Sequence, residues 1–217
     1  MITDYQQKKI KHIAITIAGN AENPSSTFAL MSRIMKMQIL HSIPIVTIRA
    51  EISDQLFEEF LRFYVKKKFL EENKIKVAFL GKWYDQSQSI VEVIKDLVKT
   101  TAEHNSYHLN FLINYDGQEE IVDACKILCR QLLAQKMSLE QIDKTKIKEN
   151  MYSSYFVPPD RIIKIGGSPT APIKPTLDGF LLWDSFHAEV FFINDAAQSP
   201  DIFEKELTAL FAGSAPT

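Results

Sequence analysis

Two patterns of apolar residues alternate along this chain of 217 residues. Short, almost continuous apolar runs at 12–20, 43–50 and 75–81 are typical of strands that are buried on both faces of a sheet. The longer segments 54–73 and 87–104, which follow the second and third runs, place apolar residues at helical spacing and charged residues on the opposite face. The first half of the chain is therefore predicted to alternate between strands and helices.

The same alternation continues to the end of the sequence. Further strands are expected at 107–115, 160–167 and 189–194, further helices at 24–42, 117–136, 180–186 and 200–213, and a short helix with a connection at 138–156. Strands that alternate with helices at this spacing favour right-handed βαβ crossovers and a mainly parallel sheet. The predicted fold class is therefore α/β: a single domain spanning 1–217, with a mainly parallel central sheet flanked by helices.

Charge and hydropathy exclude some classes of partner. The sequence has 25 Lys and Arg residues against 27 Asp and Glu residues, which gives a formal net charge of −2. Without a basic excess, the chain lacks the electrostatic footprint of a nucleic-acid-binding protein. No apolar run reaches membrane-spanning length and the first residues do not form a signal peptide, so we expect a cytoplasmic protein without a transmembrane segment.

The two cysteines, Cys125 and Cys129, stand four residues apart in a predicted helix and therefore share one face. Two thiols alone form neither a disulfide framework nor a zinc site. We interpret both as small, buried apolar side chains.

Ligands of open parallel sheets bind beyond the carboxyl ends of the strands. At these ends the sequence places Gly19 and, further along, Gly166 and Gly167. A glycine between a strand and a helix can offer backbone N–H groups to a phosphate, but it can equally serve the conformational freedom of the backbone. Each glycine is therefore a weak signal for a phosphate site.

Three segments together carry a resemblance to a known family. Residues 114–128 (NYDGQEEIVDACKIL), 158–168 (PPDRIIKIGGS) and 180–192 (FLLWDSFHAEVFF) resemble motifs of the cis-prenyltransferases, the undecaprenyl diphosphate synthase family. Those motifs read Asn-Tyr-Gly-Gly-Arg-x-Glu-Ile, Pro-Asp-Leu-Leu-Ile-Arg-Thr-Gly-Gly-Glu and Phe-Leu-Leu-Trp-Gln-x-x-Tyr-x-Glu-x-x-Phe. Residues 12–20 stand where the first family motif, which ends Met-Asp-Gly-Asn-Gly-Arg-Trp-Ala, belongs.

The resemblance implies a homodimer and an apolar tunnel that houses a growing isoprenoid chain. Enzymes of this family join isopentenyl diphosphate to an allylic diphosphate with Mg²⁺ and form a cis double bond. By position, Glu189 is the glutamate that crosses the dimer and helps to hold the metal, although an outward-facing glutamate at an interface is the alternative. Trp183 is expected in the core. His187 has no counterpart and is more readily placed at an interface than in catalysis.

The departures from the family fall on residues that handle charge. Ala18 stands where the family has its metal-binding aspartate, and a methyl group cannot coordinate Mg²⁺. Glu22 and Gln118 each replace an arginine. Lys164 keeps the charge of a third arginine but loses the fork that grips two phosphate oxygens. Because the loss of one charge contact to a transition state costs about 3 kcal/mol, ordinary chain elongation by this chain alone is not expected.

The region after the double glycine also differs from the family. Ser168 replaces a glutamate, and the loop at 169–179 is longer, rich in proline and contains one cation, Lys174. Aromatic residues near the strand ends and the third motif could stabilise a cation in an apolar cavity, or could simply pack the core. These aromatic residues are Phe111, Phe180, Phe186, Phe191 and Phe192.

The sequence thus favours a divergent isoprenoid-diphosphate enzyme that binds an isoprenyl diphosphate in an apolar tunnel. Mg²⁺ is its possible cofactor, with binding weakened because Ala18 replaces the family's aspartate. The expected diphosphate-binding residues are Gly19, Asn20, Lys164, Gly166, Gly167, Ser168 and Lys174, with Glu189 as metal ligand and no assignable catalytic residue. The alternative is a non-catalytic homologue. It would act as partner subunit of a true cis-prenyltransferase, in a heteromer, or as a protein that binds an apolar ligand.

Overall fold

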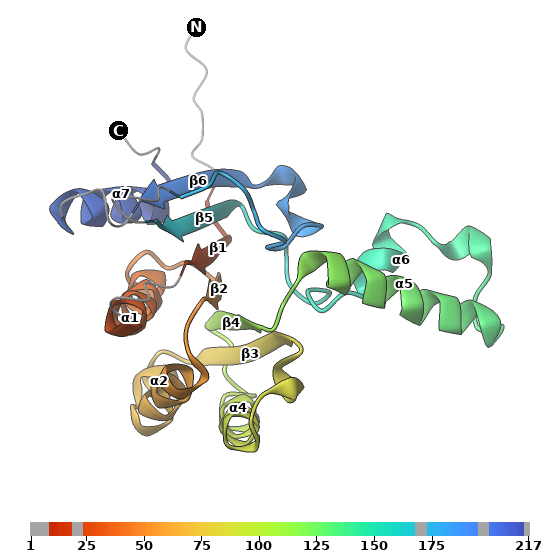
Figure 1. Ribbon diagram of the computed structural model, residues 1–217, viewed down its shortest axis with the longest axis horizontal. Helices are drawn as coiled ribbons and strands as arrows, with labels where there is room; N and C mark the ends of the chain where they lie inside the picture. The colour runs from red at the N-terminus through yellow and green to blue at the C-terminus, as the bar shows by residue number, and fades with distance from the viewer. Residues whose placement is uncertain (1–8, 19–23, 168–172, 195–199, 215–217) are drawn as a thin grey trace, which may run out of the picture.

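The computed structural model describes residues 9–18, 24–167, 173–194 and 200–214. Within them, six parallel strands form one sheet in the order β3-β4-β2-β1-β5-β6 (Figure 1). The strands are β1 (His12–Ile17), β2 (Ile45–Ala50), β3 (Ile75–Gly81), β4 (Tyr107–Ile113), β5 (Arg161–Gly166) and β6 (Glu189–Asn194). The predicted α/β class and parallel sheet are confirmed.

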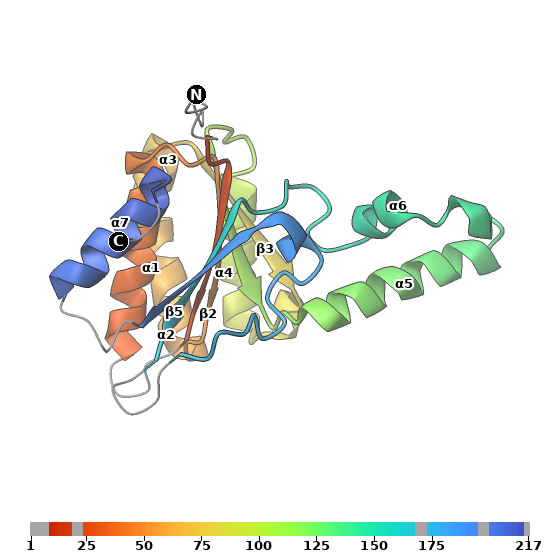
Figure 2. The same ribbon diagram turned by 90° about the horizontal axis from the view of Figure 1, so that it is seen from above.

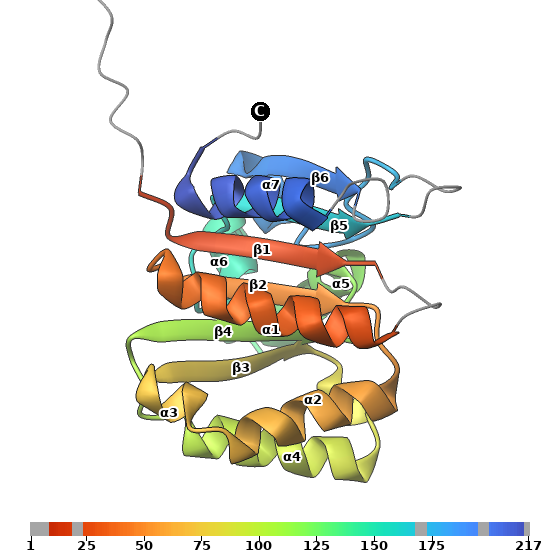
Figure 3. The ribbon, with the colours of Figure 1, turned by 90° about the vertical axis from the view of Figure 1, so that its left-hand side faces the viewer.

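The helices lie in two groups. Those in front of the sheet in Figure 3 are α1 (Pro24–Leu40), α2 (Asp54–Lys66), α3 (Phe69–Glu72), α4 (Gln88–Thr100) and α7 (Pro200–Ala212). On the other side lie α5 (Gly117–Leu133) and α6 (Lys144–Glu149), with the short 3₁₀ helices η1 (Trp83–Asp85), η2 (Leu139–Gln141) and η3 (Asp184–His187) in connections. The long helix expected at 54–73 is divided at Lys67, whose extended backbone ends α2.

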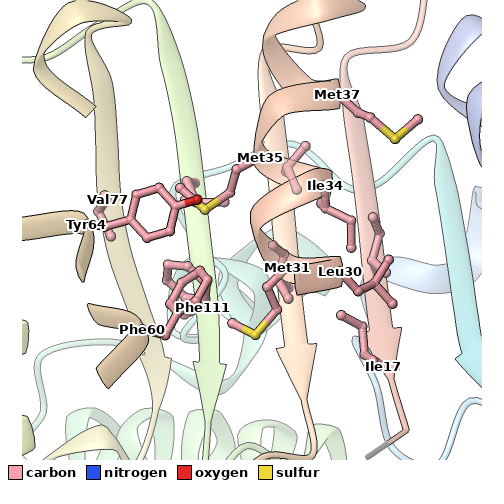
Figure 4. Close-up of a cluster of buried hydrophobic side chains, with 14 of the residues drawn as sticks. Ile17, Leu30, Met31, Ile34, Met35, Met37, Phe60, Tyr64, Val77 and Phe111 are labelled. Atoms are coloured by element: carbon pink, nitrogen blue, oxygen red, sulfur yellow. The ribbon is translucent and has the colours of Figure 1, made fainter. Parts of the chain in front are cut away.

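The main core fills the layer between the sheet and the front helices (Figure 4). Phe111 of β4 lies at its centre, with ring centroids 5.9 Å from Phe60, 6.0 Å from Phe57 and 5.6 Å from Phe79. Phe60 in turn contacts Tyr64 one helical turn further along α2, at 4.9 Å. Such aromatic pairs add stabilisation beyond their buried area. Aromatic side chains therefore fill the centre of this layer.

A smaller core lies on the other face of the sheet, where Phe180 and Leu181 pack with Ile162 and Phe156. The helix expected at 180–186 is instead a turn followed by the short η3, so this expectation was wrong. Phe180 and Leu181 are fully buried, whereas Trp183, expected in the core, is only half-buried. The positive φ of Leu181, 45°, shows why a regular helix does not run through this segment.

Helix α5 extends away from the sheet together with α6 (Figures 1 and 2). Cys125 and Cys129 are exposed on it, which contradicts the expectation that they are buried. The two cysteines do lie on one face of α5, but α5 extends away from the sheet and this face is exposed to solvent. Among the described residues, we find no helix with both the length and the apolar character needed to cross a bilayer.

Candidate functional site at the carboxyl edge of the sheet

A cavity of about 290 Å³ lies beyond the carboxyl ends of β2 and β4. Its buried apolar lining includes Met31 of α1, Phe57 of α2 and Phe111 of β4. The polar lining comes mainly from the strand ends and the start of α2, and includes Arg49, Glu51, Asp54, Gln86, Asn114 and Asp116. The cavity thus joins an apolar interior to a polar rim, an arrangement typical of sites for small amphiphilic ligands.

Two cationic side chains stand in one row across neighbouring strands. Thr16 of β1 is in register with Arg49 of β2 on one side and with Lys164 of β5 on the other. Residues in register across parallel strands project to the same face, and strands lie about 4.8 Å apart. The Cα atoms of Arg49 and Lys164 are therefore about 10 Å apart along this row, and both side chains project to the same face of the sheet.

Both cations contact the segment 174–178. Lys164, which is buried, donates from Nζ to the carbonyl oxygens of Lys174 at 3.2 Å and Thr176 at 3.0 Å, and it forms an ion pair with Asp178. Arg49 donates to the carbonyl oxygen of Asp178 at 3.1 Å. The hydrogen bond from Lys164 holds the pKa of the Asp178 carboxyl below its usual value, with help from Thr176. The loop after the double glycine thus engages the cations of this edge.

The double glycine has a structural explanation. A Cβ atom on Gly166 would come within 2.5 Å of the Cβ of Ala18, and one on Gly167 would come within 2.8 Å of Oδ1 of Asn194. Gly167 also has a φ of +90°, which other residues rarely adopt. Close packing between strand ends therefore requires these glycines, whatever they bind. Of the other expected phosphate-binding residues, Gly19, Asn20 and Ser168 lie outside the described residues.

The described residues at this edge do not bring together the ligands of a magnesium site. Ala18 directly follows β1; its N–H donates to the carbonyl oxygen of Ile165, and its methyl group faces Gly166. Asp116 is the N-cap of α5, where it accepts from the N–H groups of Gln118 at 2.7 Å and Glu119 at 3.2 Å. No group of three acidic, histidine or cysteine side chains suited to a metal occurs in the described parts of the chain.

Glu189 lies at the opposite edge of the sheet. It is the first residue of β6 and is in register with Arg161, the first residue of β5, whereas Lys164 and Gly166 lie toward the other end of that strand. Its Oε2 accepts from Nε of Arg161 at 2.9 Å, although the Glu189 side chain remains 63% exposed. Within one protomer Glu189 therefore cannot join the cavity. His187, just before it, is also exposed and contacts Phe186.

A buried polar network supports the site from the face opposite to the front helices. Asp184 is buried and accepts from Nζ of Lys148 at 2.7 and 2.8 Å, which explains this acidic residue in an apolar run. Glu120 accepts from the Tyr115 hydroxyl at 2.5 Å and from the N–H of Ser153 at 2.9 Å. Burial, followed by the nearby Glu120 charge, raises the pKa of Tyr115. These bonds fix the end of β4 at the cavity.

Sequence reasoning missed Arg49 and Asp178 as parts of the site. Arg49 stands at the carboxyl end of a predicted strand, so its position held a usable signal. Asp178 carried no such signal, because it stands in a loop and reaches Lys164 only in the folded chain.

The sequence of the chain matches a known protein family. Residues 48–212 match the family model described as "Putative undecaprenyl diphosphate synthase". The chain is 32% identical over 128 residues to the tritrans,polycis-undecaprenyl-diphosphate synthase (geranylgeranyl-diphosphate specific) of Thermoplasma volcanium. The aligned region covers 59% of this chain and 47% of the relative. The synthase of the same name from Pyrococcus horikoshii is 29% identical over 140 residues, 64% of this chain and 51% of the relative.

Two solved structures share the fold. A probable undecaprenyl diphosphate synthase from Campylobacter jejuni matches with a TM-score of 0.70 at 18% identity, and lavandulyl diphosphate synthase from Lavandula x intermedia, in complex with dimethylallyl diphosphate, matches with 0.74 at 17% identity. Each match covers 96% of this chain and 98% of the solved chain. The chain spans about half the length of the curated relatives cited above. Since the family model covers most of the chain, this protein belongs to the cis-prenyltransferase family, the family of undecaprenyl diphosphate synthases.

Proposed function

We propose that this chain binds a short isoprenyl diphosphate at the carboxyl edge of its sheet and acts in isoprenoid biosynthesis as a divergent prenyl-transferring enzyme. The observation that carries the proposal is the cavity beyond β2 and β4. In it, buried apolar side chains meet a polar rim that contains Arg49. The hydrocarbon part of the ligand would contact Met31, Phe57 and Phe111, and the diphosphate would lie at the rim.

The size of the cavity supports a short hydrocarbon chain. Its volume of about 290 Å³ is at the lower end of the roughly 300–1,000 Å³ that small-molecule sites offer. A long polyprenyl chain would need the space that Phe60, Tyr64 and Phe111 fill beneath α2. Of the two substrate classes in the relatives' names, geranylgeranyl diphosphate and dimethylallyl diphosphate, the cavity favours the smaller.

Arg49 and Lys164 are the donors that this chain offers to a diphosphate. In the described structure both hold the segment 174–178, and the Asp178 carboxylate takes a position beside Lys164 that a phosphate oxygen would need. Binding would therefore displace Asp178 and exchange one anion for another at Lys164. The two cations would orient the diphosphate and neutralise charge as it leaves. The described residues of this chain do not form a site for Mg²⁺ by themselves.

We also propose that a second subunit packs against the outer side of β6. This strand ends the sheet and carries Val190 and Phe192, each 37% exposed, while Phe186 before it is 84% exposed. Leu133 at the end of α5 is 86% exposed. Exposed apolar side chains of this size mark protein interfaces. The subunit is a second copy of this chain or a catalytic relative, and its arrival would let Glu189 approach the partner's cavity.

A non-catalytic homologue is the second candidate function. It is favoured by one observation, namely that Lys164 is neutralised within the chain by Asp178 while Ala18 offers no metal ligand. In that case the chain would contribute its fold and interface to a catalytic partner, and no isoprenyl diphosphate would bind to it alone.

Calorimetric titration with dimethylallyl, geranyl and farnesyl diphosphate, with and without Mg²⁺, tests the proposal. We expect the parent protein to bind dimethylallyl diphosphate more tightly than farnesyl diphosphate. Binding should be lost in Arg49→Gln. It should tighten in Asp178→Asn, because this substitution frees Lys164. Asp96→Asn, which removes an equal charge from the exposed side of α4, is the matched control and should behave as the parent. Absence of binding in both the parent and Asp178→Asn would refute the proposed substrate site and favour the non-catalytic candidate.

A further inference from the structure

We propose that a second cavity, at the other end of the molecule, is a binding site for a phosphate group. This cavity, of about 400 Å³, lies where α2 and α4 end and α3 begins, far along the strands from the carboxyl edge. Four lysines line it, namely Lys66, Lys67, Lys68 and Lys74. The proposal does not depend on the substrate site above, since it uses different residues at the opposite ends of the strands.

The lysines outnumber the acidic residues that could neutralise them. Glu71 is the one carboxylate among the described residues that line the cavity. Lys66, Lys68 and Lys74 are exposed, and none of these side chains forms an ion pair or a hydrogen bond with a described residue. Lys67 differs, because its Nζ lies 4.3 Å from the ring centroid of Phe63. Three cationic side chains are therefore free to converge on an anion.

The other polar groups of the cavity are engaged within the fold. The Thr100 hydroxyl donates to the carbonyl oxygen of Asp96 at 2.8 Å, and the Thr101 hydroxyl donates to that of Leu97 at 2.7 Å. Nδ1 of His104 is bonded to the carbonyl oxygen of Ile75 at 2.8 Å. Recognition in this cavity is consequently by the point charges of lysine, which are well suited to phosphate but set little geometric constraint.

Lys74 occupies a backbone position that favours glycine or asparagine. It follows Asn73 at the end of α3 with a φ of 51°, the left-handed region in which other side chains cost about 1 kcal/mol. Its backbone is fixed there, since its N–H donates to Glu71 and its carbonyl oxygen accepts from Ser106 and Tyr107. A lysine held at such a position keeps its charge at the cavity despite the local strain.

Lysines near a helix end also stabilise the helix dipole, and this is the simpler role that an experiment must separate from binding. Exposed apolar side chains stand beside the lysines: Phe63, which contacts Lys67, and Val65, which lines the cavity, are 38% and 43% exposed. Their presence allows two sources for the phosphate group, a soluble phosphate ester or the headgroup of an anionic lipid. The shared chemistry is a phosphate that accepts from several ammonium groups.

The test compares Lys66→Gln/Lys68→Gln/Lys74→Gln with a control of equal charge, Lys36→Gln/Lys136→Gln/Lys144→Gln, whose three lysines are exposed elsewhere. Sedimentation with vesicles of phosphatidylcholine, with or without phosphatidylglycerol, measures lipid binding, and titration with inorganic phosphate followed by NMR measures the soluble ion. Each lysine near a charged bilayer contributes roughly fivefold in affinity, so we expect about a hundredfold weaker vesicle binding in the first variant and no change beyond the general charge effect in the control.

Each outcome decides the question. Loss of vesicle binding confined to the cavity variant supports a lipid headgroup, and loss of phosphate binding alone supports a soluble ester. Equal losses in the two variants, or no binding by the parent protein, would overturn the proposal. If the triple variant fails to fold, Lys68→Gln replaces it, because Lys68 lies between helices and its side chain caps neither of them. For that variant we expect about fivefold weaker binding with unchanged urea unfolding.

Discussion

Arg161 provides a direct test of how the carboxyl-terminal helix is held against the sheet. Its side chain is 7% exposed and donates to the carbonyl oxygens of Leu210 at 2.8 Å, Ser214 at 3.0 Å and Gly213 at 3.1 Å, as well as to Glu189. Leu210 lies in the last turn of α7, where carbonyl groups lack an intrahelical N–H partner, and Gly213 and Ser214 directly follow the helix. One guanidinium therefore caps α7 and joins it to β5.

The perturbation is Arg161→Leu, which keeps much of the apolar packing but removes all the donors. The bond to Leu210 is buried, and a buried carbonyl that loses a charged donor costs about 2 kcal/mol. The bonds to Gly213 and Ser214 are partly accessible, so that water replaces the donor and each loss costs roughly 0.5 kcal/mol. The ion pair with the exposed Glu189 adds less than about 1 kcal/mol. We expect a loss of about 3 kcal/mol in the free energy of unfolding.

Urea unfolding followed by far-ultraviolet circular dichroism measures this loss, and hydrogen exchange shows whether the amides of α7 lose protection first. Glu189→Gln is the matched control, because it removes the ion pair and leaves the three carbonyl bonds in place. A loss below about 1 kcal/mol in Arg161→Leu, or an equal loss in the control, would show that Arg161 does not cap α7.

Three further predictions concern buried groups. Burial lowers the pKa of His12 from 6.5 to about 4, so the unfolded chain binds this proton more readily. The free energy of unfolding should therefore carry no penalty from His12 above pH 6.5 and should fall by about 3 kcal/mol as the pH is lowered to 4. Urea unfolding at several pH values should show a smaller dependence in His12→Asn. Lys148→Met leaves Asp184 charged and unpaired, and should cost about 3–5 kcal/mol, whereas Lys148→Met/Asp184→Leu should recover most of it. Gly117→Ala places a Cβ against the carbonyl oxygen of Gly179 and should lower the melting temperature, with a cost of about 1–3 kcal/mol.

Contrary results would be equally clear for these three. A His12→Asn variant with the same acid sensitivity as the parent would assign the pH dependence to other groups. A Lys148→Met variant of unchanged stability would mean that Asp184 takes up a proton or water at little cost. An alanine tolerated at position 117 would show that the contact between the start of α5 and the 179–182 turn is loose.

The alternation of strands and helices along the chain, and the parallel sheet, were predictable from the sequence for a clear physical reason. Runs such as Ile13–Ile17 and Ile162–Ile165 are apolar at nearly every position, which is typical of strands inside a parallel sheet, and segments with helical spacing lie between such runs. The segment 180–186 was misjudged, since its apolar density matches a buried helix while its backbone turns at Leu181. Local periodicity does not report such a turn.

Much of the candidate site depends on contacts that a sequence does not display. Lys164 was expected to serve a phosphate, but its neutralisation by Asp178 depends on how a proline-rich loop returns to the strand end. Cys125 and Cys129 share the predicted helical face, yet their exposure follows from the extended position of α5, a tertiary property. Glu189 was assigned by resemblance, and its bond to Arg161 became visible only through the register of β5 and β6.

The central position of β1 has a consequence for folding during synthesis. Ile13 pairs with Val46 of β2, 33 residues later, but with Arg161 of β5, 148 residues later. Closing the longer loop costs only about 1 kcal/mol more, but it cannot begin until β5 has left the ribosome. Four of the six strands, from β3 to β1 in the sheet, can therefore assemble while one edge of β1 still has unpaired N–H and C=O groups. An unprotected edge of this kind invites pairing with another nascent chain, so truncated forms that end before β5 should aggregate.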